Sequence, residues 1–210
     1  MGPARGFLAE GAEARVSEED FLGVPAVRKV RPEKSYRPAD LDRRLRLGRI
    51  RTEVRLLRDA RRAGVPTPLV LDVDEEGFSL VLERVPGRPL TELLGPGAGP
   101  LSEQEALCGR WGTLLGRLHA ARISHGDLTA SNVLWDGDHL TLLDLSLGSR
   151  EPDLEELGID LHLVEEDLNT LSAEAPRLLQ AFRAGYEGVF PGAGESLTRA
   201  QEIRGRIRYA

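Results

Sequence analysis

The sequence has little of several residue types, and each shortage excludes a class of protein. Cys108 is the single cysteine among 210 residues, so neither an internal disulfide nor a cysteine zinc site can form within the chain. The four histidines lack the spacing of metal ligands, and no apolar run approaches the length of a membrane helix. No apolar segment follows the first residues, so a secretory signal is not expected. These absences predict a cytoplasmic protein without a membrane segment.

The charge of the chain is unevenly distributed. The formal net charge is −6, but 14 of the 28 lysines and arginines lie between Arg28 and Arg62, where only 5 residues are acidic. A basic segment of this density is a candidate surface for phosphate-rich partners such as RNA. The alternative is a solvated helix surface, because arginine favours helices. A second arginine cluster suits either a frayed end or nucleic-acid contact; its members are Arg199, Arg204, Arg206 and Arg208.

The first third of the chain predicts a small β-sheet and one long helix. Residues 7–30 alternate as a β-meander, and residues 69–74 and 79–83 favour two more strands. Between them, residues 40–63 carry apolar side chains at a period close to 3.6, which indicates a helix. Glu53 is the only acid in its middle, so we expect it to pair with Lys29 of the third strand. The alternative is a surface glutamate beside an arginine of the same helix.

The later two thirds predict a mainly helical region. Two prolines and a glycine between Val85 and Pro89 indicate a hinge. The pattern from Ser102 to Glu105 predicts a capping box that opens a helix to about residue 121, with Trp111 in the core. Further helices are expected over about residues 159–171 and 175–189.

The most informative stretch is the catalytic-loop candidate between these helices, residues 125–132. Asp127 is followed by Asn132 and, after a short apolar hairpin, by Asp144. This spacing matches the protein-kinase arrangement of a catalytic aspartate, a metal-binding asparagine and a metal-binding aspartate. Asp127 would accept the proton of an attacking hydroxyl, and the other two would offer oxygen ligands to Mg²⁺. A plain surface turn is the alternative, because Gly, Asp, Ser and Asn all favour turns.

Several other residues are candidates for supporting roles. His125 either holds the loop through hydrogen bonds or takes part in the chemistry, and Asp160 suits a helix cap or a hydrogen bond to the loop backbone. The tip formed by Gly11, Ala12 and Glu13 can offer backbone N–H groups to nucleotide phosphates. An adenine would pair with the backbone near Glu83 and Val85.

With these residues in place, the chain resembles the small atypical kinase subunit of the KEOPS complex, a relative of the RIO kinases. The resemblance covers nearly the whole length. It is carried by residues 11–14, 28–31, 34–37, 41–42, 51–53, 125–132, 160–161 and 204–206. Together these segments are much more specific than any single motif.

The resemblance implies an α+β, two-lobed kinase-like fold with a short activation segment, with lobes at residues 1–84 and 85–210. It implies an archaeal or eukaryotic ATPase, able also to phosphorylate Ser/Thr, that supports threonylcarbamoyl-adenosine modification of tRNA with ATP and Mg²⁺. The implied partners are the threonylcarbamoyl-transferase subunit, a small N-lobe-binding regulator and tRNA, the last through residues 28–62 and the terminal arginines. Lys29 would contact the nucleotide phosphates and Glu53 would orient it.

One departure from this resemblance concerns the segment after Asp144. Leu145 and Ser146 stand where the family usually has Phe and Gly, and serine disfavours a backbone conformation with positive φ. Two other functions stay open. One is a small-molecule phosphotransferase of the aminoglycoside or choline kinase type, and the other is a non-catalytic kinase-like scaffold.

Overall fold

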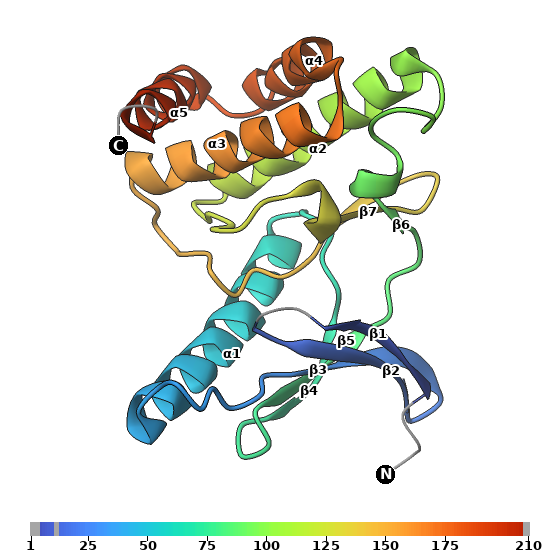
Figure 1. The fold of residues 1–210 in the computed structure, drawn as a ribbon, viewed down its shortest axis with the longest axis vertical. Helices are drawn as coiled ribbons and strands as arrows, with labels where there is room; N and C mark the ends of the chain where they lie inside the picture. Colours follow the sequence, from blue (N-terminus) through green and yellow to red (C-terminus); the bar gives the residue numbers. More distant parts are fainter. Residues whose placement is uncertain (1–4, 11–12, 208–210) are drawn as a thin grey trace.

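The chain folds into a small β-lobe and a larger, mainly helical lobe (Figure 1). The computed structural model describes residues 5–10 and 13–207. The β-lobe is a five-stranded antiparallel sheet in the order β1-β2-β3-β5-β4. Its strands are β1 (Arg5–Glu10), β2 (Arg15–Phe21), β3 (Val24–Val30), β4 (Val70–Asp74) and β5 (Ser79–Glu83). The predicted meander and the two later strands are therefore confirmed.

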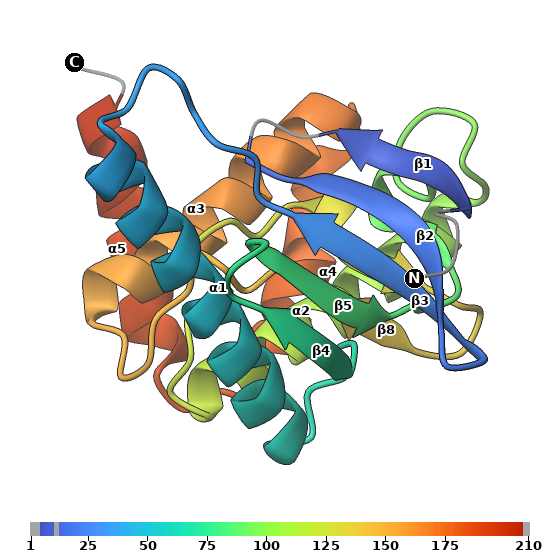
Figure 2. The same ribbon diagram turned by 90° about the horizontal axis from the view of Figure 1, so that it is seen from below.

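One long helix, α1 (Ala39–Arg62), runs alongside this sheet (Figure 2). Its apolar stripe buries Ile50, Leu56 and Leu57 in a core that continues into the helical lobe. Gly64 follows the helix with a φ of +80°, a conformation that glycine adopts without the penalty of a Cβ atom. The helix predicted for residues 40–63 is confirmed.

The second lobe consists of four helices and a small sheet. The helices are α2 (Leu101–Ala120), α3 (Leu154–Leu171), α4 (Ala175–Glu187) and α5 (Ala193–Ile207). The sheet joins β6 (Arg88–Pro89), β7 (Val133–Trp135) and β8 (Leu140–Leu142), with two 3-10 turns, η1 (Leu90–Glu92) and η2 (Ala130–Asn132). The strand β5 is the last in sequence of the first sheet, and β6 pairs with β7 in the second. The lobe boundary between residues 84 and 85 stays a prediction.

The core of the helical lobe forms where α2 packs on α4. Trp111 is fully buried there and meets Phe182 edge-on, with ring centroids 5.4 Å apart. The prediction that Trp111 belongs to the core is confirmed. No helix within residues 5–10 and 13–207 is long and apolar enough to cross a bilayer.

Two predicted helix starts were wrong. The helix α2 begins at Leu101 after Pro100, without a side-chain cap, so Ser102 already lies inside the first turn. The capping box of the lobe is instead Asp153 with Glu156, which begins α3 five residues before the predicted start. The acidic residues Glu155 and Glu156 therefore lie in the first turn of α3, ahead of the predicted start.

The arginine-rich end is also different from the frayed tail considered above. Residues 193–207 form α5, which packs against α3 (Figure 1). Arg204 pairs with the buried Glu165 of α3, and Arg206 lies 3.1 Å from Glu155. Arg199 pairs with Glu202 on its own helix at 2.8 Å. Arg208 lies outside the described residues.

Candidate active site

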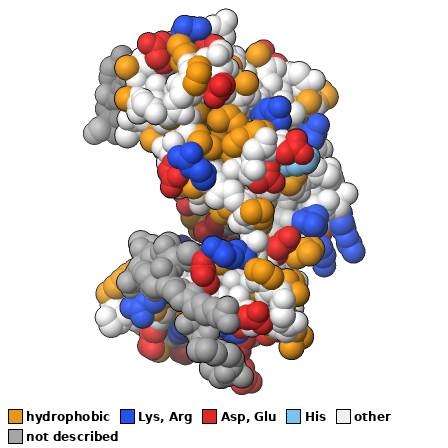
Figure 3. All heavy atoms as spheres, turned by 90° about the vertical axis from the view of Figure 1, so that its right-hand side faces the viewer, with side chains coloured by type: hydrophobic (Ala, Val, Ile, Leu, Met, Phe, Trp, Pro, Cys, Tyr) orange, Lys and Arg blue, Asp and Glu red, His pale blue; other side chains and the backbone are white. Residues whose placement is uncertain are grey.

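The largest hollow connected with the predicted catalytic residues is a cleft between the two lobes (Figure 3). Its volume is about 420 Å³. Its apolar walls come from Val16, Val27 and Leu82 on the sheet side and from Leu134 and Leu143 on the other. The cleft is lined by four residues predicted for nucleotide binding and by both predicted metal ligands, namely Lys29, Glu53, Glu83 and Val85 with Asn132 and Asp144.

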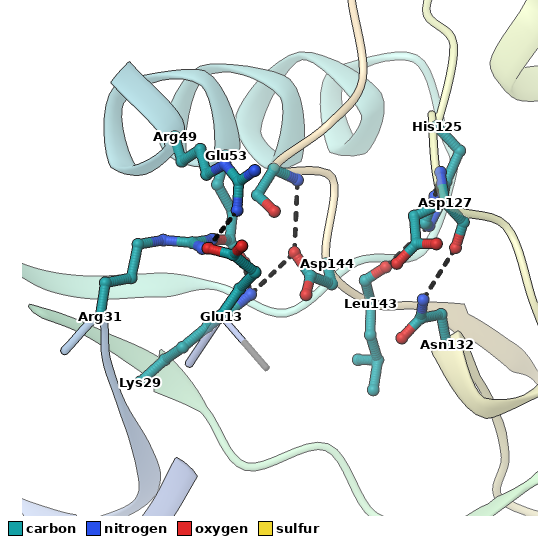
Figure 4. A network of polar contacts seen from close by, with 11 residues as sticks. Glu13, Lys29, Arg31, Arg49, Glu53, His125, Asp127, Asn132, Leu143 and Asp144 are labelled. Atoms are coloured by element: carbon teal, nitrogen blue, oxygen red, sulfur yellow. Dashed lines mark hydrogen bonds and ion pairs between the residues drawn. The ribbon is translucent and has the colours of Figure 1, made fainter. Parts of the chain in front are cut away.

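Lys29 is the centre of the charged end of this cleft (Figure 4). It lies on β3 and is only 7 % exposed. Its Nζ atom lies 2.7 Å from Oε1 of Glu53 and 2.7 Å from Oδ1 of Asp144. The predicted ion pair between Lys29 and Glu53 is therefore present, and the lysine also reaches the acid of the opposite lobe.

A second cation also binds Glu53, and no sequence pattern predicted it. Arg31, which is 3 % exposed, places Nη2 at 2.9 Å from Oε2 of Glu53. Glu53 itself is fully buried, and a buried carboxylate needs both charge compensation and hydrogen bonds. With one cation on each oxygen, Glu53 holds α1 to the sheet through Lys29 of β3 and through Arg31, which follows the end of that strand.

Asp144 is kept ionised by this arrangement. Burial acts to raise the pKa of its carboxyl, but the Lys29 ammonium outweighs that effect and holds the pKa well below its usual range. The opposite charge and the hydrogen bond both favour the carboxylate form. Asp144 is therefore an anion throughout the neutral range.

The segment after Asp144 accommodates the departure from the usual sequence. The positive φ, +53°, belongs to Asp144 itself, and Ser146 is not among the residues with positive φ. Leu145 is fully buried, as an apolar anchor requires, and the N–H of Ser146 donates to Asp144 Oδ1 at 3.3 Å. Serine at position 146 is thus compatible with the backbone found here.

The catalytic-loop candidate is held by buried polar groups from α3 and from its own histidine. Asp160, fully buried, accepts hydrogen bonds from the backbone N–H groups of His125 and Gly126, both at 2.7 Å. His125 is hydrogen-bonded through Nε2 to Leu143 O at 2.9 Å and accepts from the Asp127 N–H through Nδ1 at 3.2 Å. The structural reading of His125 is therefore supported, and Asp160 binds the loop backbone rather than capping a helix.

Asp127 and Asn132 lie together at the mouth of the cleft. The Nδ2 atom of Asn132 donates to the backbone oxygen of Asp127 at 2.8 Å (Figure 4). Asp127 is exposed, yet desolvation by the surrounding protein raises the pKa of its carboxyl. The nearby carboxylates of Asp144 and Asp160 act in the same direction, against His125 and Lys29. A raised pKa makes this carboxylate a stronger base than an ordinary aspartate.

The expected phosphate loop is only partly described. Gly11 and Ala12 lie outside the described residues. Glu13 is ion-paired with Arg49 of α1 at 2.6 Å and with Arg37 at 3.1 Å. This carboxylate therefore contacts arginines and is not among the residues that line the cleft.

The hinge side of the cleft offers backbone groups. Glu83 and Val85 both line it, and the Glu83 carboxylate accepts from the N–H of Leu69 at 3.0 Å. Among the described residues, no acceptor for the N–H of Val85 is present. An unpaired N–H on an apolar wall is suited to a heterocyclic ring with an acceptor nitrogen.

The donor set also fits a hard cation bound with phosphate. Across the described ranges 5–10 and 13–207, no group of three or more His, Cys, Asp or Glu could hold a metal alone. Asn132 and Asp144, whose side chains both carry oxygen atoms, nevertheless both line the cleft. Mg²⁺ is usually held by one or two protein oxygens, with phosphate and water completing its shell.

Comparison with known proteins agrees with this geometry. A profile described as "Phosphotransferase enzyme family" matches residues 40–124. Proteins named "Probable bifunctional tRNA threonylcarbamoyladenosine biosynthesis protein" are similar over nearly the whole chain. The one from Methanosarcina mazei is 40 % identical over 209 residues, 99 % of this chain and 36 % of the relative. The one from Thermoplasma acidophilum is 33 % identical over 199 residues, 95 % of this chain and 36 % of the relative.

The chain is a kinase-fold homologue of part of these proteins. It spans about a third of the length of the curated relatives that it matches. The relatives come from archaea. Their similarity over nearly the whole chain, together with the phosphotransferase profile, confirms the resemblance drawn from the sequence motifs.

The burial of Glu53 predicts that removing its carboxylate costs more stability than removing the carboxylate of an exposed glutamate. Glu53→Ala should lower the free energy of unfolding by roughly 3 kcal/mol or more, because it leaves the buried Arg31 and Lys29 without their shared partner. The matched control is Glu75→Ala, which removes the partner of Arg51 in an exposed ion pair and should change the free energy of unfolding much less, because solvent screens such a pair. Urea unfolding of both variants checks this. Equal losses would contradict it.

Proposed function

We propose that the chain is an ATP-dependent phosphotransferase or ATPase that supports threonylcarbamoyl-adenosine modification of tRNA. The observation that carries the proposal is the position of Lys29, which joins Glu53 of α1 to Asp144 of the other lobe at 2.7 Å each. In kinase-like enzymes this lysine–glutamate pair positions the nucleotide phosphates. The names of the relatives supply the biological process.

Each polar residue of the cleft then has a role that its position supports. Lys29 exchanges part of its contact with Asp144 for nucleotide phosphate, while Glu53 keeps it in place. Asp127 accepts the proton of the attacking hydroxyl or water. Asn132 and Asp144 hold Mg²⁺, which supplies positive charge to the phosphates when bound. The adenine lies on the apolar walls and meets the backbone near Glu83 and Val85.

The short segment after Asp144 favours the ATPase reading over protein phosphorylation. Residues 144–153 are all described and lead directly into α3. They are tied back to the strand-like segment before the catalytic loop, since Glu151 N–H donates to Arg122 O at 2.9 Å and Ser124 N–H to Ser149 O at 3.1 Å. This leaves little chain to form a platform for an extended peptide. Phosphorylation of Ser or Thr side chains is the additional activity that the resemblance implies.

The proposed partners follow from the relatives and from the arrangement of charge. Those relatives are named for tRNA modification, so we include tRNA, the transferase subunit and the small N-lobe-binding regulator of KEOPS, with the complex in the cytoplasm. One face of α1 presents five exposed arginines at helical spacing, namely Arg44, Arg51, Arg55, Arg58 and Arg62. Two of these, Arg51 and Arg58, pair with Glu75 and Asp59, but among the described residues Arg44, Arg55 and Arg62 have no ion-pair partner. Arg199, Arg204 and Arg206 of α5 are all paired with acids. We therefore assign RNA contact to α1 before the C-terminal helix.

The enzymatic proposal is tested by ATP turnover of the wild type and Asp127→Asn, with and without the transferase subunit and tRNA. Loss of a general base should lower turnover by roughly 10²- to 10⁴-fold. Because the pKa of Asp127 is raised, wild-type turnover should fall on the acid side at a higher pH than for an ordinary aspartate. Asp127→Asn should lose that dependence. Nucleotide binding without turnover in every mixture would leave the scaffold alternative.

A small-molecule phosphotransferase is the second candidate, and the profile match over residues 40–124 favours keeping it. That match ends before the catalytic loop, so it does not indicate which molecule accepts the phosphate. Phosphate transfer to a small amine or alcohol in the same assay, faster than ATP hydrolysis with tRNA and partner, would favour this candidate and contradict the proposal.

The RNA surface has its own test. The double variant Arg44→Gln/Arg55→Gln should weaken tRNA binding and lower the slope of log affinity against log salt by about 2, because each phosphate contact contributes about 1. The control is Arg206→Gln, which removes an arginine already paired with Glu155 and should leave the slope unchanged. Fluorescence anisotropy across salt concentrations measures both. An unchanged slope in the α1 variant would overturn the assignment.

A further inference from the structure

The helix α3 contacts the catalytic loop with two acids, and only the first matches a motif of the sequence. Asp160 binds the start of the loop at His125 and Gly126. Asp167 lies seven residues later, close to two helical turns, and therefore on the same face. Its Oδ2 atom accepts the backbone N–H of Ala130 at 2.6 Å. The two acids bracket the segment that contains Asp127.

The N–H of Ala130 needs a partner from outside its own turn. Ala130 is the first residue of η2, and Thr129 before it gives no side-chain cap. The first N–H groups of a helical turn have no partner within it. Since Ala130 is fully buried, water is a poor substitute, and an unmade hydrogen bond there is costly. The Asp167 carboxylate supplies the acceptor across the helix–loop interface.

The turn that Asp167 anchors ends at Asn132. Leu143 N–H donates to Asn132 O at 2.9 Å, and Asn132 Nδ2 donates to Asp127 O at 2.8 Å. The direction of the Asn132 side chain thus depends on how η2 sits between α3 and the hairpin. A displacement of the Ala130 backbone would therefore also displace Asn132, a proposed metal ligand two residues later.

We propose that Asp167 is a positioning residue that fixes the far end of the catalytic loop, so that Asn132 faces the Mg²⁺ of the bound nucleotide. This inference rests on the proposed function for the role of Asn132. It assigns to Asp160 and Asp167 different tasks: the first sets the backbone before Asp127, and the second sets the turn that carries Asn132. Asp167 itself lies outside the residues that line the cleft.

The test compares Asp167→Leu with Asp167→Asn in two measurements. In the nucleotide-free protein, Asp167→Leu should speed hydrogen exchange of the Ala130 amide by at least about tenfold, whereas Asp167→Asn keeps an acceptor and should stay much closer to wild type. Calorimetry with a non-hydrolysable ATP analogue gives the ratio of the affinity with Mg²⁺ to the affinity without it. This ratio should be about tenfold smaller in Asp167→Leu than in the wild type. Binding without Mg²⁺ should be unchanged.

The control is Glu166→Gln, an exposed acid on the same helix, which should change neither measurement. Faster exchange at Ala130 together with a wild-type Mg²⁺ effect would overturn the positioning role and leave a purely structural one. Unchanged exchange in a folded Asp167→Leu protein would overturn the anchor itself. If the wild type binds no nucleotide while the exchange result holds, the anchor stands and the proposed function fails.

Discussion

The structure depends on one buried carboxylate shared by two cations. Glu53 is inaccessible to solvent, so α1 can bury it only if both of its oxygens are compensated. Lys29 of β3 and Arg31, the residue after the end of β3, do so. This fixes the register of a long helix against a small sheet, and it leaves the Lys29 ammonium between the two lobes. The third contact of that ammonium, with Asp144, brings the metal-binding candidate of the helical lobe to the same point.

In the helical lobe, the backbone N–H groups of the catalytic loop also need hydrogen-bond partners. A loop that must present Asp127 and Asn132 cannot satisfy its own N–H groups through regular ladders. The buried helix α3 provides carboxylates at two levels, and His125 adds hydrogen bonds to the hairpin. The reactive residues stay at the mouth of the cleft, while the groups that hold them are buried behind. The side chains proposed for catalysis are therefore different from the side chains that hold the loop in place.

The sequence predicted the parts that follow from local spacing. The interval from Asp127 to Asn132 and Asp144, and the place of Glu53 near the stripe of α1, identified the cleft before any coordinates. Arg31 was missed because no pattern in the sequence marks an arginine just after a strand as buried, and Asp167 because no motif of the sequence marks its contact with Ala130. The capping error has a similar cause. Ser102 with Glu105 and Asp153 with Glu156 have the same local pattern, and only tertiary packing decides which one begins a helix.

Lys29 has two tasks in this structure: it pairs with Glu53 together with Arg31, and we propose that it binds the nucleotide phosphates. Calorimetry with a non-hydrolysable ATP analogue and Mg²⁺, alongside urea unfolding, tests this most directly in Lys29→Met. We expect a folded variant with a lower free energy of unfolding, because Oε1 of the buried Glu53 loses its cation. Its affinity should fall by about tenfold or more, the loss expected for charge-assisted hydrogen bonds. Wild-type affinity in a folded Lys29→Met protein would contradict it.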